Sequence, residues 1–383
     1  MVALTGAAVA APTALGLTRA QQLAIERSPQ MAAYDAAITA ARHLAAPPSR
    51  SSEATGQTGI APLPVEDADA LSYGRDANPV RRIDVAREVS SPEQREALAQ
   101  RYAREADRAA AEKTAITVDI ARDAALAWLD CYYVEKISRV AGEGLKAAQA
   151  ELEAAESTYW AGRVSQADFY GARSVLVMFE DKSSEVEHRV RAARIALNRW
   201  VGDAGDAPLD GLPNIDRIRL RAGALEGDLV RQPDVALLEK QEDLGASDVR
   251  LAQANRQPQR EIAVLVARRD EAHAARQEKL RAKVAEFRIM IDLWQHARDR
   301  RNRYANELVP LARERTQATL AAYRGGKASL TDVLGARRAE SETQMQSVEM
   351  ERETARVWAR LEFALPETLP TAQTGSLREE NPR

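Results

Sequence analysis

The stretch YWAGRVSQADFYGAR occupies residues 159–173, and a close copy of it, YRGGKASLTDVLGAR, occupies residues 323–337. A long helical pattern leads up to the tyrosine of each copy, and another begins a few residues later. Gly162 and Gly326 stand just after these tyrosines, where a glycine suits the left-handed conformation that ends a helix. Each copy therefore predicts the end of one helix followed closely by the start of the next.

A Ser-x-x-Asp pattern follows each glycine, as Ser165 with Asp168 and as Ser329 with Asp332. This spacing predicts a capping box, which satisfies free backbone N–H groups and places a carboxylate at the positive end of the new helix. Each copy is therefore interpreted as a tight reversal between two antiparallel helices. The reversals are predicted at residues 161–165 and 325–329.

Long helices are predicted on both sides of each reversal. Apolar residues between Leu126 and Tyr159 recur mostly at spacings of three and four, which indicates a narrow coiled-coil-like seam. Val309-Pro310 is expected to interrupt the second long helix, because proline removes a backbone hydrogen bond. We expect an all-α-dominated fold with two long antiparallel coiled-coil hairpins from an internal duplication, an α-barrel protomer with reduced or absent β-barrel strands.

The duplication extends to the segments that precede the hairpins, where LAIERSPQMAAYDAA at 23–37 resembles DLVRQPDVALLEKQ at 228–241. Placing Pro29 over Pro233 gives an offset of 204, against 164 at the reversals, so the first half carries about 40 additional residues. The predicted divisions are an N-terminal segment (1–17), a first front helix (18–46), a loop or eroded β-hairpin (47–91), the first helical hairpin (92–202), a connector (203–226), a second front helix (227–257), the second hairpin (258–366) and a disordered tail (367–383).

Composition limits the function classes. The 383 residues carry a net charge of −3, which gives no basic field for nucleic acid, and only one cysteine, Cys131. The sequence contains no run of 18 apolar residues, so no transmembrane helix is predicted. The start, MVALTGAAVAAPTALG, is interpreted either as the end of a signal peptide that begins upstream or as a disordered terminus.

With the duplicated hairpin in place, the chain resembles the outer-membrane efflux protein (TolC-like) family, in its heavy-metal branch. The resemblance covers residues 17–366 and is specific in the combination of its motifs. They are RDAALAWLDCYYVEK (122–136), YWAGRVSQADFYGAR (159–173), ALNRWVG (196–202), RQPDVALLEKQ (231–241), ELVPLARERTQATLAAYRGGKASLTDVLGARRAE (307–340) and ARVWARLEFALP (355–366).

The resemblance implies a homotrimer whose long helices form a tunnel across the periplasm and whose strands form a barrel in the outer membrane. It implies as partners a periplasmic adaptor and an inner-membrane RND pump driven by protons. The paired reversals would be the periplasmic tips, where two hairpins per chain make a pseudo-sixfold closure. The implied location is the cell envelope of a Gram-negative bacterium, in the outer membrane or periplasm.

The chain departs from this pattern at the barrel strands. The second strand hairpin is missing, and VRRIDVAREV (80–89) places charges where lipid would meet a strand. We therefore expect residues 47–91 to form loop or a short, irregular strand pair rather than a membrane span.

No enzyme site is predicted. His43, His188, His273 and His296 never stand at a ligand spacing with cysteine or carboxylates, so no metal site and no cofactor is expected. No nucleophile with its base and no phosphate-binding loop is evident. Trp128, Trp200, Trp294 and Trp358 are assigned to helix contacts rather than to ligand binding.

The candidate site is the repeated tip set, to which we assign a role in gating or in adaptor docking. Capping explains its glycine, serine and aspartate, but not its tyrosine and arginine, which could tie neighbouring hairpins together. The set comprises Tyr159, Gly162, Ser165, Asp168 and Arg173 with Tyr323, Gly326, Ser329, Asp332 and Arg337.

Two functions remain open at this point. The first is a duct that exports metal cations or small toxic compounds without catalysis of its own. The second is a degenerate, soluble coiled-coil scaffold without transport activity.

Overall fold

The computed structural model describes residues 14–46, 91–162, 165–221 and 223–368. Within these ranges the regular elements are helices, together with one isolated bridge between Leu15 and Leu209. The helices are α1 (Leu17–Glu26), α2 (Pro29–Ala45), α4 (Pro92–Trp160), α5 (Gln166–Val201), α6 (Leu225–Leu229), α7 (Pro233–Ala254), α8 (Gln259–Arg303), α9 (Val309–Arg324) and α10 (Leu330–Glu362). The all-α fold class is confirmed, whereas the expectation of a loop or short strand pair at 47–91 falls almost entirely outside the described residues.

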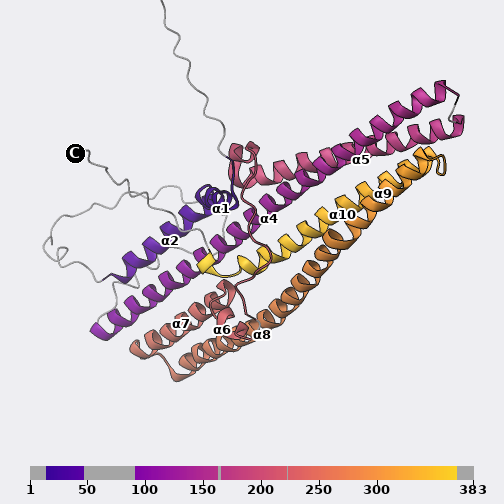
Figure 1. The fold of residues 1–383 in the computed structure, drawn as a ribbon. Coiled ribbons are helices and arrows are strands. Elements are labelled where there is room, and N and C mark those ends of the chain that lie inside the picture. The colour runs from indigo at the N-terminus through magenta and orange to yellow at the C-terminus, as the bar shows by residue number, and fades with distance from the viewer. Residues whose placement is uncertain (1–13, 47–90, 163–164, 222, 369–383) are drawn as a thin grey trace, which may run out of the picture. The chain divides into compact units, whose positions relative to one another are not determined.

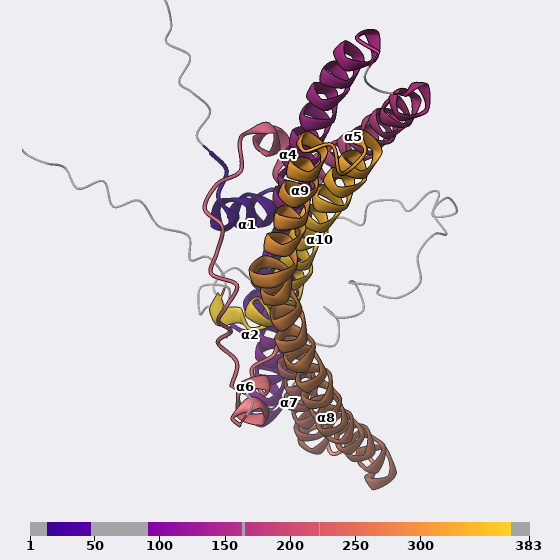
Figure 2. The same ribbon diagram turned by 45° about the vertical axis from the view of Figure 1, so that its right-hand side comes forward.

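The chain divides into two units, and the larger one holds residues 1–31, 114–233 and 280–383. In this unit α4 and α5 run antiparallel as hairpin 1, and α9 and α10 run antiparallel as hairpin 2 (Figure 1). Figures 1 and 2 both show the turns of the two hairpins at the same end of the unit. The predicted internal duplication of a helical hairpin is therefore confirmed.

The core of this unit is built on tryptophan and aliphatic side chains. Trp128, Leu129 and Tyr133 of α4 are fully buried, and they pack in one cluster with Trp294 of α8 and Trp358 of α10. Each indole N–H donates to a backbone carbonyl outside the long helices: Trp128 to Leu15 (2.8 Å), Trp294 to Ile215 (3.1 Å) and Trp358 to Arg217 (2.9 Å). These tryptophans therefore fix irregular segments of the chain to the long helices.

The second unit holds residues 32–113 and 234–279. It contains the start of α4, most of α7 and the first part of α8, around a small apolar cluster of Val249, Ala252 and Ile262. Ion pairs join α4 to α7, since Arg101 Nε lies 2.7 Å from Asp248 Oδ1.

The two front regions differ from the single helices that we expected. The first region is interrupted at residues 27 and 28, between α1 and α2, and the second is interrupted between α6 and α7. Pro29 and Pro233 each begin the second helix of their pair. Proline suits a first helical position, because no N–H is needed there, and it drives the preceding residue out of the helical conformation.

The interruption predicted at Val309-Pro310 takes the form of a π-helical turn (Tyr304–Leu308) between α8 and α9. Pro310 cannot donate to the carbonyl four residues earlier, and its ring would crowd that carbonyl in a regular α-helix. A wider turn just before the proline accommodates both effects.

Candidate functional site at the hairpin tips

The turn of hairpin 1 follows the predicted local chemistry. Gly162 has φ of 71°, and its N–H donates to the carbonyl of Tyr159 at 2.9 Å. Ser165 caps α5, because its Oγ accepts from the backbone N–H of Asp168 at 3.1 Å. The intervening residues 163 and 164 lie outside the described part of the chain.

The turn of hairpin 2 repeats this arrangement. Gly326 has φ of 73° and donates to the carbonyl of Tyr323 at 2.9 Å. Ser329 Oγ accepts from the N–H of Asp332 at 3.1 Å, and Asp332 Oδ2 accepts from the N–H of Ser329 at 2.9 Å. These backbone and side-chain bonds from Ser329 lower the pKa of Asp332. The serine cap is therefore present at both tips, whereas the complete capping box is seen in the described residues only at Ser329 and Asp332.

The two tip tyrosines have different surroundings. Tyr159 stacks on Phe169, with ring centroids 5.0 Å apart and planes at 18°, so it joins the last turn of α4 to the first turn of α5. Tyr323 packs beside the apolar cluster of Ala172, Leu330 and Leu334, which spans both hairpins. Packing thus accounts for both tyrosines, which capping left unexplained.

The two tip arginines differ still more. The Nε and Nη2 atoms of Arg337 lie 3.1 and 3.0 Å from Oε1 of Glu151, so this side chain joins α10 to α4 of the other hairpin. Its Nη1 also lies 3.3 Å from Glu340. Arg173 is exposed, and the structure shows no hydrogen bond or ion pair between its side chain and any other described residue. The tip set is therefore only partly brought together within one chain.

Three residues that the sequence reasoning left out complete the tips. Glu151 is the partner of Arg337, Thr331 donates to Asp168 across the two hairpins at 3.3 Å, and Trp160 is a largely exposed side chain beside Tyr159. Trp160 stood in the quoted repeat and could have been noticed there. Glu151 carried no local signal, because it resembles the many other carboxylates along the helices.

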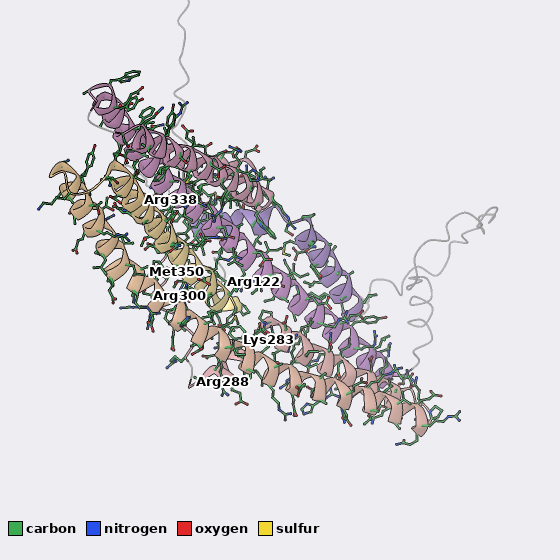
Figure 3. All side chains as sticks on the ribbon, turned by 90° about the vertical axis from the view of Figure 1, so that its right-hand side faces the viewer. Arg122, Lys283, Arg288, Arg300, Arg338 and Met350 are labelled. Carbon is green, nitrogen blue, oxygen red and sulfur yellow. The ribbon has the colours of Figure 1, made fainter. Side chains whose placement is uncertain are left out.

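A groove of about 900 Å³ runs between the hairpins below the tips. Apolar side chains such as Phe179 and Met345 line it together with charged groups such as Arg189 and Glu349. Arg338, labelled in Figure 3, also lines it and lies 3.3 Å from the sulfur of Met178. Grooves that combine apolar and charged side chains in this way can bind an amphipathic helix.

Groups suited to binding a metal ion do not gather in the described residues. No cluster of three or more histidine, cysteine, aspartate or glutamate side chains with metal-ligand geometry is present there. Burial raises the pKa of the Cys131 thiol to about 12, so its reactive thiolate form is suppressed. None of the helices in the described ranges combines the length and the apolar composition that a bilayer crossing requires.

Comparisons with known proteins find matches among solved structures. No protein-family model and no curated protein matches the chain. The CmeC outer membrane channel of Campylobacter jejuni has a TM-score of 0.70 and 13% identity, over 93% of this chain and 87% of CmeC. The outer membrane protein VceC of Vibrio cholerae has a TM-score of 0.66 and 18% identity, over 92% and 96% of the two chains. The MtrE outer membrane channel of Neisseria gonorrhoeae has a TM-score of 0.64 and 14% identity, over 92% and 89%.

Proposed function

The chain has the fold of the outer membrane channels, the fold that its sequence resemblance to the TolC-like efflux proteins implies, and on this premise we propose that it is the duct subunit of a tripartite efflux system in a Gram-negative cell envelope. The duct is passive and has no catalytic site. The observation that carries this proposal is the pair of capped hairpins whose turns lie at one end of the same unit.

The duct is a homotrimer. One chain leaves large apolar side chains exposed along its helices, among them Val177 and Ile195 of α5 and Ile289 and Leu293 of α8. Exposed apolar surface of this extent favours association, and two unlike faces on one chain allow head-to-tail contacts that can close into a ring. Three copies with two hairpins each would close a tunnel lined by helices.

The tips and the groove between the hairpins are the proposed docking and gating region. A periplasmic adaptor would place a helical hairpin in the groove lined by Phe179, Met345 and Arg189, and an RND pump would drive transport. Opening would require separation of the hairpins, which are joined here by Arg337–Glu151 and Thr331–Asp168. The exported substrates are metal cations or small toxic compounds.

Deletion of the gene in the native host tests the proposal. The minimal inhibitory concentrations of copper, zinc, cobalt, nickel and cadmium salts and of cationic dyes are measured for the wild-type strain, for the deletion strain, and for the deletion strain with a plasmid that carries the gene. We expect the deletion to lower resistance to at least one of these compounds and the plasmid to restore it. Unchanged resistance to the whole panel, together with a monomeric purified protein, would support the soluble scaffold instead.

A further inference from the structure

The joint between the two hairpins of one chain has a defined set of contacts. On α10, Leu334 and Ser341 are buried and Arg337 binds Glu151 of α4. Ser341 lies against Gly144 of α4, where an added Cβ would come within 2.7 Å of the serine Oγ. This face of α10 and this face of α4 are therefore in contact along at least two helical turns.

The sequence repeat relates each residue of this joint to a residue 164 positions away. On α5, the positions equivalent to Leu334, Arg337 and Ser341 are Tyr170, Arg173 and Val177. Tyr170 is 55% exposed and Val177 is 56% exposed, and Arg173 is exposed as well. The face that is covered on α10 is therefore uncovered on α5.

On the α4 side of the joint, residues that are covered within the chain likewise have exposed equivalents in the repeat, here on α9. Ala147, Ala150 and Glu151 of α4 border a cavity shared with Leu330, Val333 and Arg337 of α10. The positions equivalent to these three α4 residues on α9 are Leu311, Glu314 and Arg315. All three are exposed, Leu311 by 59%, and Leu308, the equivalent of Gly144, is exposed too.

A pair of glycines gives a further observation. In hairpin 1, a Cβ added to Gly171 would lie 3.2 Å from Oγ1 of Thr331 in hairpin 2. At its equivalent Gly335, an added Cβ would meet no described atom within 4 Å apart from its chain neighbours and the nearby backbone of its own helix. The repeat thus keeps a glycine at a place where one chain provides no close neighbour.

We propose that the exposed face of α5 in one copy of this chain packs against the exposed face of α9 and α10 in the next copy, as α10 packs against α4 and α5 within one chain. The joint places Val177 on Leu308, and Arg173 beside Glu314. Glu314 replaces Glu151 as the counter-charge, since the position equivalent to Glu151 is Arg315. Because the two faces are unlike, successive copies join head to tail, and the proposed trimer closes this series into a ring. This inference rests on the ring assembly of the proposed function and names its interface.

The joint between copies differs from the joint within a chain. Glycine and serine meet within the chain, whereas valine and leucine meet between copies, so the second joint is wider. Arg315 lies beside the Arg173–Glu314 pair and weakens it. Ala167 stands where Thr331 supplies a hydroxyl within the chain, so the equivalent of the bond to Asp168 is missing. Hairpins therefore separate more readily between copies than within one chain.

Charge reversal tests the ion pair. The full-length variants Arg173→Glu and Glu314→Arg and the double variant are compared by analytical ultracentrifugation, with circular dichroism to confirm that each is folded. We expect each single reversal to raise the concentration at which the trimer half-dissociates by about tenfold or more, and the double variant to recover most of this loss. Arg313→Glu is the matched control, because Arg313 lies on the other side of α9, near Glu340.

If the wild-type chain is a trimer and neither single reversal weakens it, this interface is wrong and the proposed duct still stands. A monomeric wild-type chain overturns both the interface and the proposed function.

Disulfide trapping tests the geometry independently. The double variant Val177→Cys/Leu308→Cys is oxidised and run on a non-reducing gel, where we expect a covalent three-chain species. Each single-cysteine variant is the control and should stay unlinked, because the two faces differ. Cys131 does not compete, since its side chain is buried. A folded trimer that gives no linked species in the double variant contradicts the proposed contact.

Discussion

Arginine occupies two equivalent positions of the repeat, but its side chain forms different interactions at each. Arg337 is partly buried between Glu151 and Glu340, whereas its equivalent Arg173 is exposed to solvent. A charge pair that is shielded from water interacts more strongly than an exposed one, and loss of one partner leaves the other charge poorly solvated. Residue identity alone therefore does not set the energetic role of these arginines.

Replacing Arg337 with glutamine should lower the free energy of unfolding. Glu151 has a side-chain exposure of only 15%, so loss of its counter-charge should cost about 1–3 kcal/mol. Arg338→Gln is the matched control on the next residue, because the pair of Arg338 with Glu342 is about half exposed and should contribute about 0.5 kcal/mol or less. Urea denaturation followed by circular dichroism measures both, and equal effects would contradict the assigned role of Glu151.

At the scale of single elements, the caps are the local signals that end and begin helices. The Ser329–Asp332 box pairs backbone N–H groups at the start of α10, and its hydrogen bonds to the carboxylate lower the pKa of Asp332. A lowered pKa means that folding favours the ionised form. The cap therefore contributes its full stability above the ordinary aspartate pKa and loses it as the pH falls through the lowered one.

The pH dependence of this cap can be measured with Asp332→Asn. The variant should unfold at a lower temperature than the wild type at neutral pH, because asparagine cannot supply the ionised acceptor. The difference should shrink as the pH is lowered through the acidic range, where the wild-type carboxylate becomes protonated. Thermal unfolding at a series of pH values checks this, and a difference that grows in acid would contradict it.

Two glycines of α4 offer a test of how closely the hairpins approach. A Cβ on Gly142 would meet no atom within 4 Å, whereas a Cβ on Gly144 would lie 2.7 Å from Ser341 Oγ and 3.0 Å from Phe179 Cε1. Gly142→Ala should therefore stabilise the protein by about 0.5–1 kcal/mol through helix propensity alone. Gly144→Ala should instead destabilise it by about 1–3 kcal/mol, because both neighbours must move. Denaturant titration of the two variants measures both changes in stability. Stabilisation by both substitutions would show that α4 does not approach Ser341 and Phe179 closely.

At the scale of the whole molecule, irregular segments are fixed to the long helices of the larger unit by tryptophans. Trp294 and Trp358 hold the connector at Ile215 and Arg217, and Arg301 adds an ion pair with Asp216. These contacts join the two halves of the duplicated chain around one apolar core.

Phenylalanine at 294 or 358 keeps most of the buried ring but removes the N–H donor. Each substitution should cost about 1 kcal/mol and leave a connector carbonyl without its partner. In the double variant, we expect limited proteolysis to cut the connector faster than in the wild type. Trp160→Phe is the control, because Trp160 is largely exposed and the structure shows no hydrogen bond from it to a described connector residue. An unchanged cleavage rate in the double variant would show that the tryptophans do not hold the connector.

The sequence by itself determined where helices end and begin at the tips. Gly162, Gly326 and the two Ser-x-x-Asp patterns act through hydrogen bonds that span three or four residues, so local order was sufficient to predict them. The duplication and the all-α class followed from the same signals and from the periodicity of apolar residues.

Other features depended on tertiary structure. Arg337 binds Glu151 across 186 residues, while Arg173 forms no hydrogen bond or ion pair with a described residue, although both arginines stand in a Gly-Ala-Arg sequence. The nearby sequence distinguishes them at Glu340, whose equivalent is Leu176, but it gives no sign of Glu151, which lies on a distant helix. The difference arises because helix packing brings α4 against α10, with Gly144 beside Ser341, and leaves one face of α5 and one face of α9 uncovered in a single chain. Local hydrogen bonding thus set the ends of the helices at the tips, and the close approach of distant helices decided which of their faces are paired.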